Sequence, residues 1–162
     1  MLGPGKAIRG RSGPRLKYAL SMSPESRPAR ILAALLVVTA IVTVAYWVNY
    51  FTGGDVKTVD ARWYIAFENA FPVADGWLAA TSFLAGIGLW RGAQWGALMG
   101  LLAGSALLYL AAMDITFDLQ NNMYALLRTS PQMQFETLIN IWSLALGAWA
   151  VIACWRRATV RS

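Results

Sequence analysis

The sequence lacks histidine and contains one cysteine, Cys154. The absence of histidine excludes histidine-ligated haem, histidine-assisted metal sites and catalysis by Ser-His-Asp or Cys-His groups. A single cysteine excludes an intrachain disulfide, a CxxC redox pair and a cysteine-rich zinc site. Charged residues are also scarce, at 14% of the 162 residues, whereas soluble proteins contain about 25%. The composition therefore argues against an ordinary soluble globular protein.

The sequence instead contains long apolar segments, and 57% of its residues are hydrophobic. A helix needs about 20 apolar residues to cross about 30 Å of hydrocarbon. We expect an all-α fold, an integral membrane four-helix bundle over residues 30–157, with spans at 31–51, 72–91, 93–113 and 138–155. The first segment is too long for the apolar region of a signal peptide, and bulky aromatic residues stand where a cleavage site would be, so we expect a retained helix.

Charge asymmetry predicts the orientation of the bundle. Basic residues precede the first span, mark the turn at Arg91 and follow the last span, whereas seven of the eight acidic residues fall in the two longer connections. The positive-inside rule then places both termini in the cytoplasm, with the protein in a bacterial-type plasma membrane. Residues 1–29 are expected to form a disordered basic cytoplasmic arm and 158–162 a tail. Because the basic residues are split between the two ends, we expect no nucleic-acid partner.

Small residues in the third span share one helical face with acidic residues. At about 100° per residue, Gly96, Gly100 and Gly104 lie in phase with Asp114 and Asp118. Glycines at this spacing let helices approach closely in lipid, and they predict a possible helix-packing partner. Similar stripes occur in the second and fourth spans, so we expect the acidic residues to face the bundle axis. The residues of these two stripes are Glu68, Asp75, Ala79, Ser82 and Gly86, and Glu136, Asn140, Ser143, Gly147 and Ala150.

Residues 62–71 predict a short interfacial helix before the second span. Trp63, Phe67 and Phe71 share a helical face there, and aromatic residues are favoured at the membrane interface. We expect the aromatic side chains of the chain to lie mainly in the core or in two interfacial belts.

The outward acidic residues form the candidate site. Several interpretations remain open: hydrated or paired surface groups, a Ca²⁺ or Mg²⁺ site, a pocket for a small amphiphile walled by aromatic residues with the acids at its mouth, or acid–base catalysis. No cofactor, metal or catalytic residue is assigned. The aromatic walls would be Tyr46, Phe67, Phe71 and Tyr109, and the candidate ligand-binding residues are Glu68, Asp75, Asp114, Asp118, Asn121 and Asn140.

Four spans with carboxylates at one end resemble the architecture of the sterol-isomerase and sigma-2-receptor group, with Trp63, Glu68 and Asp114 as counterparts. The resemblance implies a small membrane enzyme, and without histidine its acid–base chemistry would fall to Asp and Glu. Small multidrug transporters carry a functional Glu in the first span, but residues 31–51 contain no acidic residue. Claudin-like proteins need a cysteine pair in the first outer loop, which this chain lacks.

These patterns favour a non-enzymatic membrane protein. It would be an interaction partner, or it would bind a small ligand, lipid or cation in an outward-facing acidic cavity. The alternative is a small membrane enzyme of the isomerase type.

Overall fold

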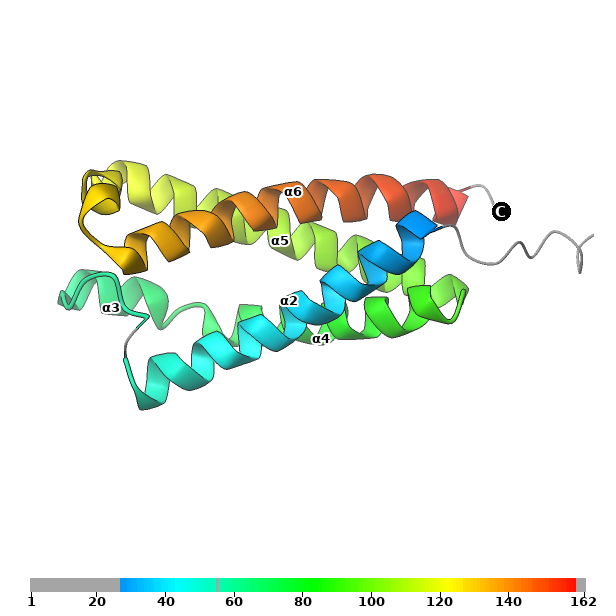
Figure 1. Ribbon diagram of the computed structural model, residues 1–162, viewed down its shortest axis with the longest axis horizontal. Helices are drawn as coiled ribbons and strands as arrows, with labels where there is room; N and C mark the ends of the chain where they lie inside the picture. Colours follow the sequence, from blue (N-terminus) through cyan, green and yellow to red (C-terminus); the bar gives the residue numbers. More distant parts are fainter. Residues whose placement is uncertain (1–26, 55, 160–162) are drawn as a thin grey trace, which may run out of the picture.

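A computed structural model of the protein describes residues 27–54 and 56–159, which form helices and short connections without a strand (Figure 1). Most of the predicted arm, residues 1–26, lies outside the described residues, as do 160–162, whereas residues 27–29 begin the first described helix. The elements are α2 (Arg27–Thr52), α3 (Arg62–Glu68), α4 (Pro72–Trp90), α5 (Gln94–Gln120), the 3-10 helix η1 (Met123–Arg128) and α6 (Pro131–Thr159).

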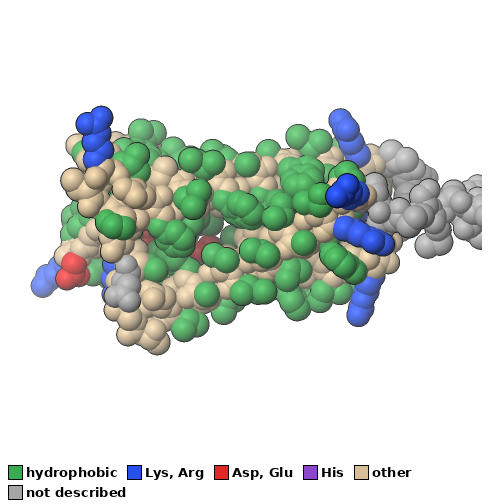
Figure 2. Space-filling model, in the orientation of Figure 1, with side chains coloured by type: hydrophobic (Ala, Val, Ile, Leu, Met, Phe, Trp, Pro, Cys, Tyr) green, Lys and Arg blue, Asp and Glu red, His purple; other side chains and the backbone are tan. Residues whose placement is uncertain are grey.

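Four segments are long and apolar enough to cross a membrane, namely α2, α3 together with α4, α5 and α6. Large apolar side chains cover much of the outer surface between the two ends of the bundle (Figure 2). In water this exposure would be costly, whereas in lipid it is the expected outer face of spanning helices. The chain is therefore a multi-pass membrane protein with an all-helical fold. Its orientation and the membrane that contains it stay predictions.

The spanning helices run alternately up and down. The start of α2, the end of α6 and the turn between α4 and α5 lie together (Figure 1), and we call this the basic end because Arg30, Arg91 and Arg156 lie there. The opposite end, which contains α3 and η1, is called the acidic end. The turn at the basic end needs Gly92, whose φ of +67° is in the left-handed region that glycine enters without steric cost.

The four helices do not close into a symmetrical ring. Helix α2 packs along α4, α4 along α5 and α5 along α6, whereas α2 and α6 touch only sparsely. In Figure 1 these two helices diverge from the basic end toward the acidic end. The bundle therefore has one open seam, between α2 and α6.

Glycine contacts inside the bundle account for the small-residue stripe of α5. A Cβ atom on Gly104 would lie 2.9 Å from the carbonyl oxygen of Gly147, and one on Gly147 would lie 3.0 Å from the carbonyl oxygen of Gly104. Gly96 meets Gly88 of α4 in the same way, and Gly100 faces Cys154. These glycines hold α5 close to α4 and α6 of the same chain. A role for Gly96, Gly100 and Gly104 toward a second protein stays a prediction.

Burial follows the predicted helical faces. Gly100 and Asp118 on α5, Ser82 on α4, and Asn140 and Ser143 on α6 are all buried. The helices extend beyond the predicted spans because their polar ends continue the same packing faces: α5 runs on to Gln120, and α6 begins at Pro131.

The segment before the second span is helical over residues 62–68, which form the separate helix α3. This helix is shorter than the predicted 62–71, and its position at the membrane interface stays a prediction. The phase comparison between Glu68 and the second span assumed a kinked helix continuing through Pro72. Instead, Pro72 stands at the start of α4, where a proline lacks no intrahelical hydrogen bond.

Candidate functional site

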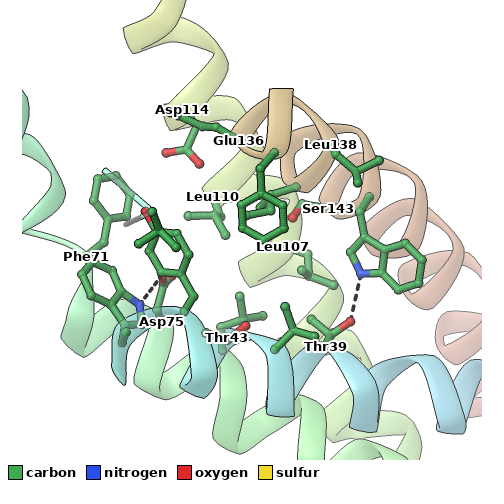
Figure 3. Close-up of a pocket in the computed structure, with 18 of the residues that line it drawn as sticks. Thr39, Thr43, Phe71, Asp75, Leu107, Leu110, Asp114, Glu136, Leu138 and Ser143 are labelled. Atoms are coloured by element: carbon green, nitrogen blue, oxygen red, sulfur yellow. Dashed lines mark hydrogen bonds between the residues drawn. The ribbon is translucent and has the colours of Figure 1, made fainter. Parts of the chain in front are cut away.

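A cavity of about 430 Å³ lies inside the acidic half of the bundle (Figure 3). All four long helices line it, and most of its wall is apolar, including Val42 of α2, Leu78 of α4, Leu107 of α5 and Phe135 of α6. Four carboxyl groups also line it, those of Glu68, Asp75, Asp114 and Glu136. An apolar cavity of this size with a few convergent polar groups is typical of a small-molecule site.

Two of these carboxyl groups receive hydrogen bonds from aromatic side chains of α2. The hydroxyl of Tyr46 donates to Oε2 of Glu68 at 3.1 Å, and Nε1 of Trp47 donates to Oδ2 of Asp75 at 2.9 Å. Glu68 and Asp75 are each 8% exposed. Because α2 packs along α4, two adjacent residues of α2 reach two different helices. Tyr46 contacts Glu68 at the end of α3, and Trp47 contacts Asp75 in the first turn of α4.

Glu136 of α6 is held by groups from the segment between α2 and α4. The hydroxyl of Thr58 donates to Oε2 of Glu136 at 2.7 Å, and the hydroxyl of Tyr64 lies 3.4 Å from the same oxygen. Tyr64 is almost fully buried, with Met123 and Met133. These contacts bring the loop after α2 and helix α3 over the acidic end of the cavity.

Asp118 lies behind Glu136, outside the cavity wall. Its side chain is fully buried, and the charge of Glu136 acts on it electrostatically. Asn140 Nδ2 lies 3.5 Å from Asp118 Oδ2, whereas Asp118 Oδ1 and Asn140 Oδ1 are buried without a hydrogen-bond partner. Burial and the Asp118 carboxylate raise the pKa of the nearby Tyr124 phenol, which keeps that phenol a donor.

Asp114 of α5 differs from the other acidic residues of the wall. Among residues 27–54 and 56–159, it has no hydrogen-bond donor and no basic partner, and the other four carboxyl groups act on it electrostatically. Figure 3 shows its carboxyl group beside Leu110 and Glu136. Asp114 is therefore the wall carboxyl group without a hydrogen bond or an ion pair in the described part of the chain.

The mouth of the cavity opens sideways between α2 and α6. Val42 and Leu138 line the cavity and are 45% and 60% exposed, respectively. Figure 2 shows a recess between the apolar side chains of these helices, with acidic side chains visible inside it. The expectation that the acids stand at the mouth is corrected: they lie at the floor, because the aromatic donors of α2 and the loop after it enclose them.

The structure brings most of the predicted ligand-binding residues together. Glu68, Asp75 and Asp114 line the cavity, and Asp118 and Asn140 lie just behind its wall. Asn121 is not part of this group: it is exposed, and its side chain donates to the Phe117 carbonyl of its own helix.

The predicted aromatic walls need correction. Tyr46 and Phe71 line the cavity, whereas Tyr109 is 63% exposed on the outer surface. Phe67 stacks on Phe117 with ring centroids 3.6 Å apart, and Trp63 lies against the same ring. Trp63, the third counterpart in the family resemblance, is therefore outside the cavity.

Sequence reasoning missed the hydrogen-bond donors that organise the acidic residues. Trp47, one of the aromatic residues expected in the core or in a belt, is 9% exposed and donates a hydrogen bond to Asp75, a role that the sequence did not predict. Thr58 and Tyr64 carried no motif that linked them to Glu136, which is more than 70 residues away in the sequence. The only sequence signal for these contacts was the cluster of aromatic residues near the end of α2, which includes Tyr46 and Trp47.

No group of three or more Asp, Glu or Cys side chains suited to a metal ion occurs in the described part of the chain. Comparison of the sequence and fold with protein-family models, curated proteins and solved structures finds no match. The chemistry of the site therefore has to be inferred from its own residues.

Proposed function

We propose that this membrane protein binds a small amphiphile with a positively charged head group, and that the head group contacts Asp114. The observation that supports this most directly is a carboxyl group on the wall of an apolar cavity without a donor or a basic partner among the described residues. Asp114 is half-buried in this apolar surrounding, and a carboxylate held partly away from water gains from a partner that supplies charge and hydrogen-bond donors. A protonated amine supplies both a charge and hydrogen-bond donors, and its alkyl chain matches the apolar wall.

The charge of the whole cavity favours a cation over an anion or a neutral molecule. Four carboxyl groups line the wall, and Asp118 stands directly behind it. Within the described residues, the charged groups that act most strongly on Asp114 are acidic, namely Glu68, Glu136, Asp75 and Asp118. An anionic head group would be repelled by this arrangement, and a neutral alcohol would leave the excess negative charge uncompensated.

The membrane and the orientation are part of this proposal. Basic residues gather at the end that contains the start of α2, the end of α6 and Arg91, which supports a cytoplasmic basic end in a plasma membrane. The acidic half of the bundle, with the cavity, would then face outward. Its ligand would be drawn from the outer leaflet or from the space outside the cell.

Thermal unfolding of the protein in nanodiscs tests the proposal, with dodecylamine as the probe and 1-dodecanol as the uncharged probe of equal chain length. A ligand at about a hundredfold excess over its Kd stabilises the folded state by about 2.7 kcal/mol. We expect dodecylamine to raise Tm and 1-dodecanol to leave it almost unchanged. Equal shifts with the two probes would contradict the role of the carboxyl groups.

A matched pair of variants locates the effect. Asp114→Asn keeps the size of the side chain but removes its charge, and we expect it to abolish the Tm shift caused by dodecylamine. Asp60→Asn removes one charge from an exposed position at the same end of the molecule and should preserve the shift. Loss of the shift in both variants would point to a nonspecific surface effect and count against the proposal.

A second candidate function is acid–base catalysis, and the electrostatic proximity of buried Asp118 to Glu136 on the cavity wall is the observation that favours it. Two neighbouring carboxyl groups can supply an acid and a base from one position when one of them is protonated. Native mass spectrometry would identify the amphiphile that copurifies with the protein. Incubation of that compound with substoichiometric protein then separates the two functions: conversion shows catalysis, and an unchanged compound supports binding alone.

A further inference from the structure

We infer that the ligand enters the cavity from the hydrocarbon of the bilayer, through the open seam between α2 and α6, and is therefore a membrane-dissolved, chain-bearing molecule. This inference rests on the proposed function and adds to it the route of entry and the part of the ligand that remains in the seam. We call the seam at the cavity the lateral portal. Its residues are Val38 and Val42 of α2 and Phe135, Leu138 and Trp142 of α6.

The residues of the lateral portal line the cavity and are also exposed on the outer surface of the bundle, unlike the rest of the cavity wall. Each of its residues lines the cavity, and each is at least 38% exposed on the outer surface of the bundle. By contrast, the walls formed by α4 and α5 are closed, since Leu78 and Leu107 are 2% and 1% exposed. Exposed apolar side chains of spanning helices face lipid. The portal therefore connects the cavity with hydrocarbon.

The acidic end of the cavity is covered. The hydrogen bond from Thr58 to Glu136 joins the loop after α2 to α6, and Tyr64 fills the space beneath it at 1% exposure. Val56 of the same loop lines the cavity from this side. A molecule arriving from water at this end would have to break the contact between Thr58 and Glu136, whereas a molecule in the lipid meets an opening.

Toward the basic end of the bundle, the portal stops at a hydrogen bond between α6 and α2. Nε1 of Trp142 donates to Oγ1 of Thr39 at 3.0 Å, and this bond crosses the seam between α6 and α2. Toward the basic end the two helices approach each other (Figure 1), and toward the acidic end Thr43 and Leu138 line the cavity (Figure 3). The opening is therefore confined to the half of the bundle that contains the carboxyl groups.

This geometry orients the ligand. Three of the four wall carboxyl groups, those of Glu68, Asp75 and Asp114, lie on α3, α4 and α5, whereas Glu136 and one side of the portal lie on α6. A head group at Asp114 would direct its chain through apolar walls toward the portal and into the lipid. The cavity therefore suits a single-chain amphiphile whose chain extends into the bilayer, in preference to a short water-soluble amine.

Substitutions in the portal test the route. We expect Leu138→Trp to raise the dodecylamine concentration needed for a half-maximal Tm shift by about tenfold, equivalent to about 1.4 kcal/mol. Ile141→Trp is the matched control, since Ile141 is also on α6 and is 60% exposed but does not line the cavity. A second pair lies on α2, where Val42→Trp changes a portal residue and Ile41→Trp is its exposed control outside the cavity. This pair decides the test if Leu138→Trp lowers the Tm of the unliganded protein.

Two further measurements separate this inference from the proposed function. Butylamine, which has the same head group and a short chain, should give no Tm shift at equal concentration. Photolabelling with a dodecylamine that carries a diazirine in its chain should modify peptides containing residues 38–42 or 135–142. Labelling confined to residues 56–64, or full binding by both portal variants, would overturn the lateral route, and loss of binding in Asp114→Asn would still uphold the proposed function. No Tm shift in the unsubstituted protein would refute both.

Discussion

The indole of Trp142 on α6 donates a hydrogen bond to the hydroxyl of Thr39 on α2, and the two atoms are 3.0 Å apart. The Thr39 hydroxyl donates its own hydrogen to the carbonyl of Leu35 at 2.9 Å, which leaves its oxygen lone pairs free to accept from the indole. This bond joins the two helices that otherwise touch sparsely. It lies where the bundle changes from a packed core to a cavity.

Trp142→Phe removes this donor while keeping an aromatic ring at the position. A hydrogen bond of this kind contributes about 1 kcal/mol net, so we expect a lower Tm in detergent or nanodiscs. Trp155→Phe is the control, because Trp155 is 61% exposed and its indole makes no hydrogen bond within the described residues. Equal Tm values for the two variants would show that the bond across the seam does not stabilise the bundle.

The contact between α5 and α6 predicts a strong effect at Gly104. In Gly104→Ala the new Cβ atom would lie 2.9 Å from the Gly147 carbonyl oxygen, and overpacking of this type costs about 1–3 kcal/mol. Gly76→Ala makes the same chemical change where nothing lies within 4 Å. There the better helix propensity of alanine, about 1 kcal/mol, should leave Tm unchanged or raised. Thermal unfolding of both variants checks this, and a tolerated Gly104→Ala would mean that the two helices separate easily.

The charge distribution predicts which end of the bundle faces the cytoplasm. In a Cys154→Ala background, single cysteines at Thr129 and Ala93 report the acidic end and the turn at the basic end, respectively. We expect a membrane-impermeant maleimide to label Thr129→Cys in intact cells, and Ala93→Cys only after permeabilisation. The reverse pattern would contradict the positive-inside assignment and place the cavity toward the cytoplasm.

Local sequence patterns determined the faces of the helices. Glycine, serine and carboxylate residues recur at helical spacing, and in lipid the small and polar side chains must face other helices while the large apolar ones face outward. This is why the burial of Asp75, Asp118 and Asn140 followed from the sequence. Length and hydropathy fixed the number of spanning segments for the same reason: the bilayer imposes one thickness on each of them.

Tertiary structure decided which polar groups meet and where the cavity opens. The bonds from Trp47 to Asp75 and from Thr58 to Glu136 join distant segments, and helical phase alone does not fix how far one helix slides or tilts against another. The open seam depends on the divergence of α2 and α6, which close glycine contacts elsewhere in the bundle permit. The sequence alone thus determined the acidic stripes and the membrane-spanning helices. Helix tilt turned those stripes into the floor of a laterally open cavity, because it separates the two helices that no small-residue contact holds together.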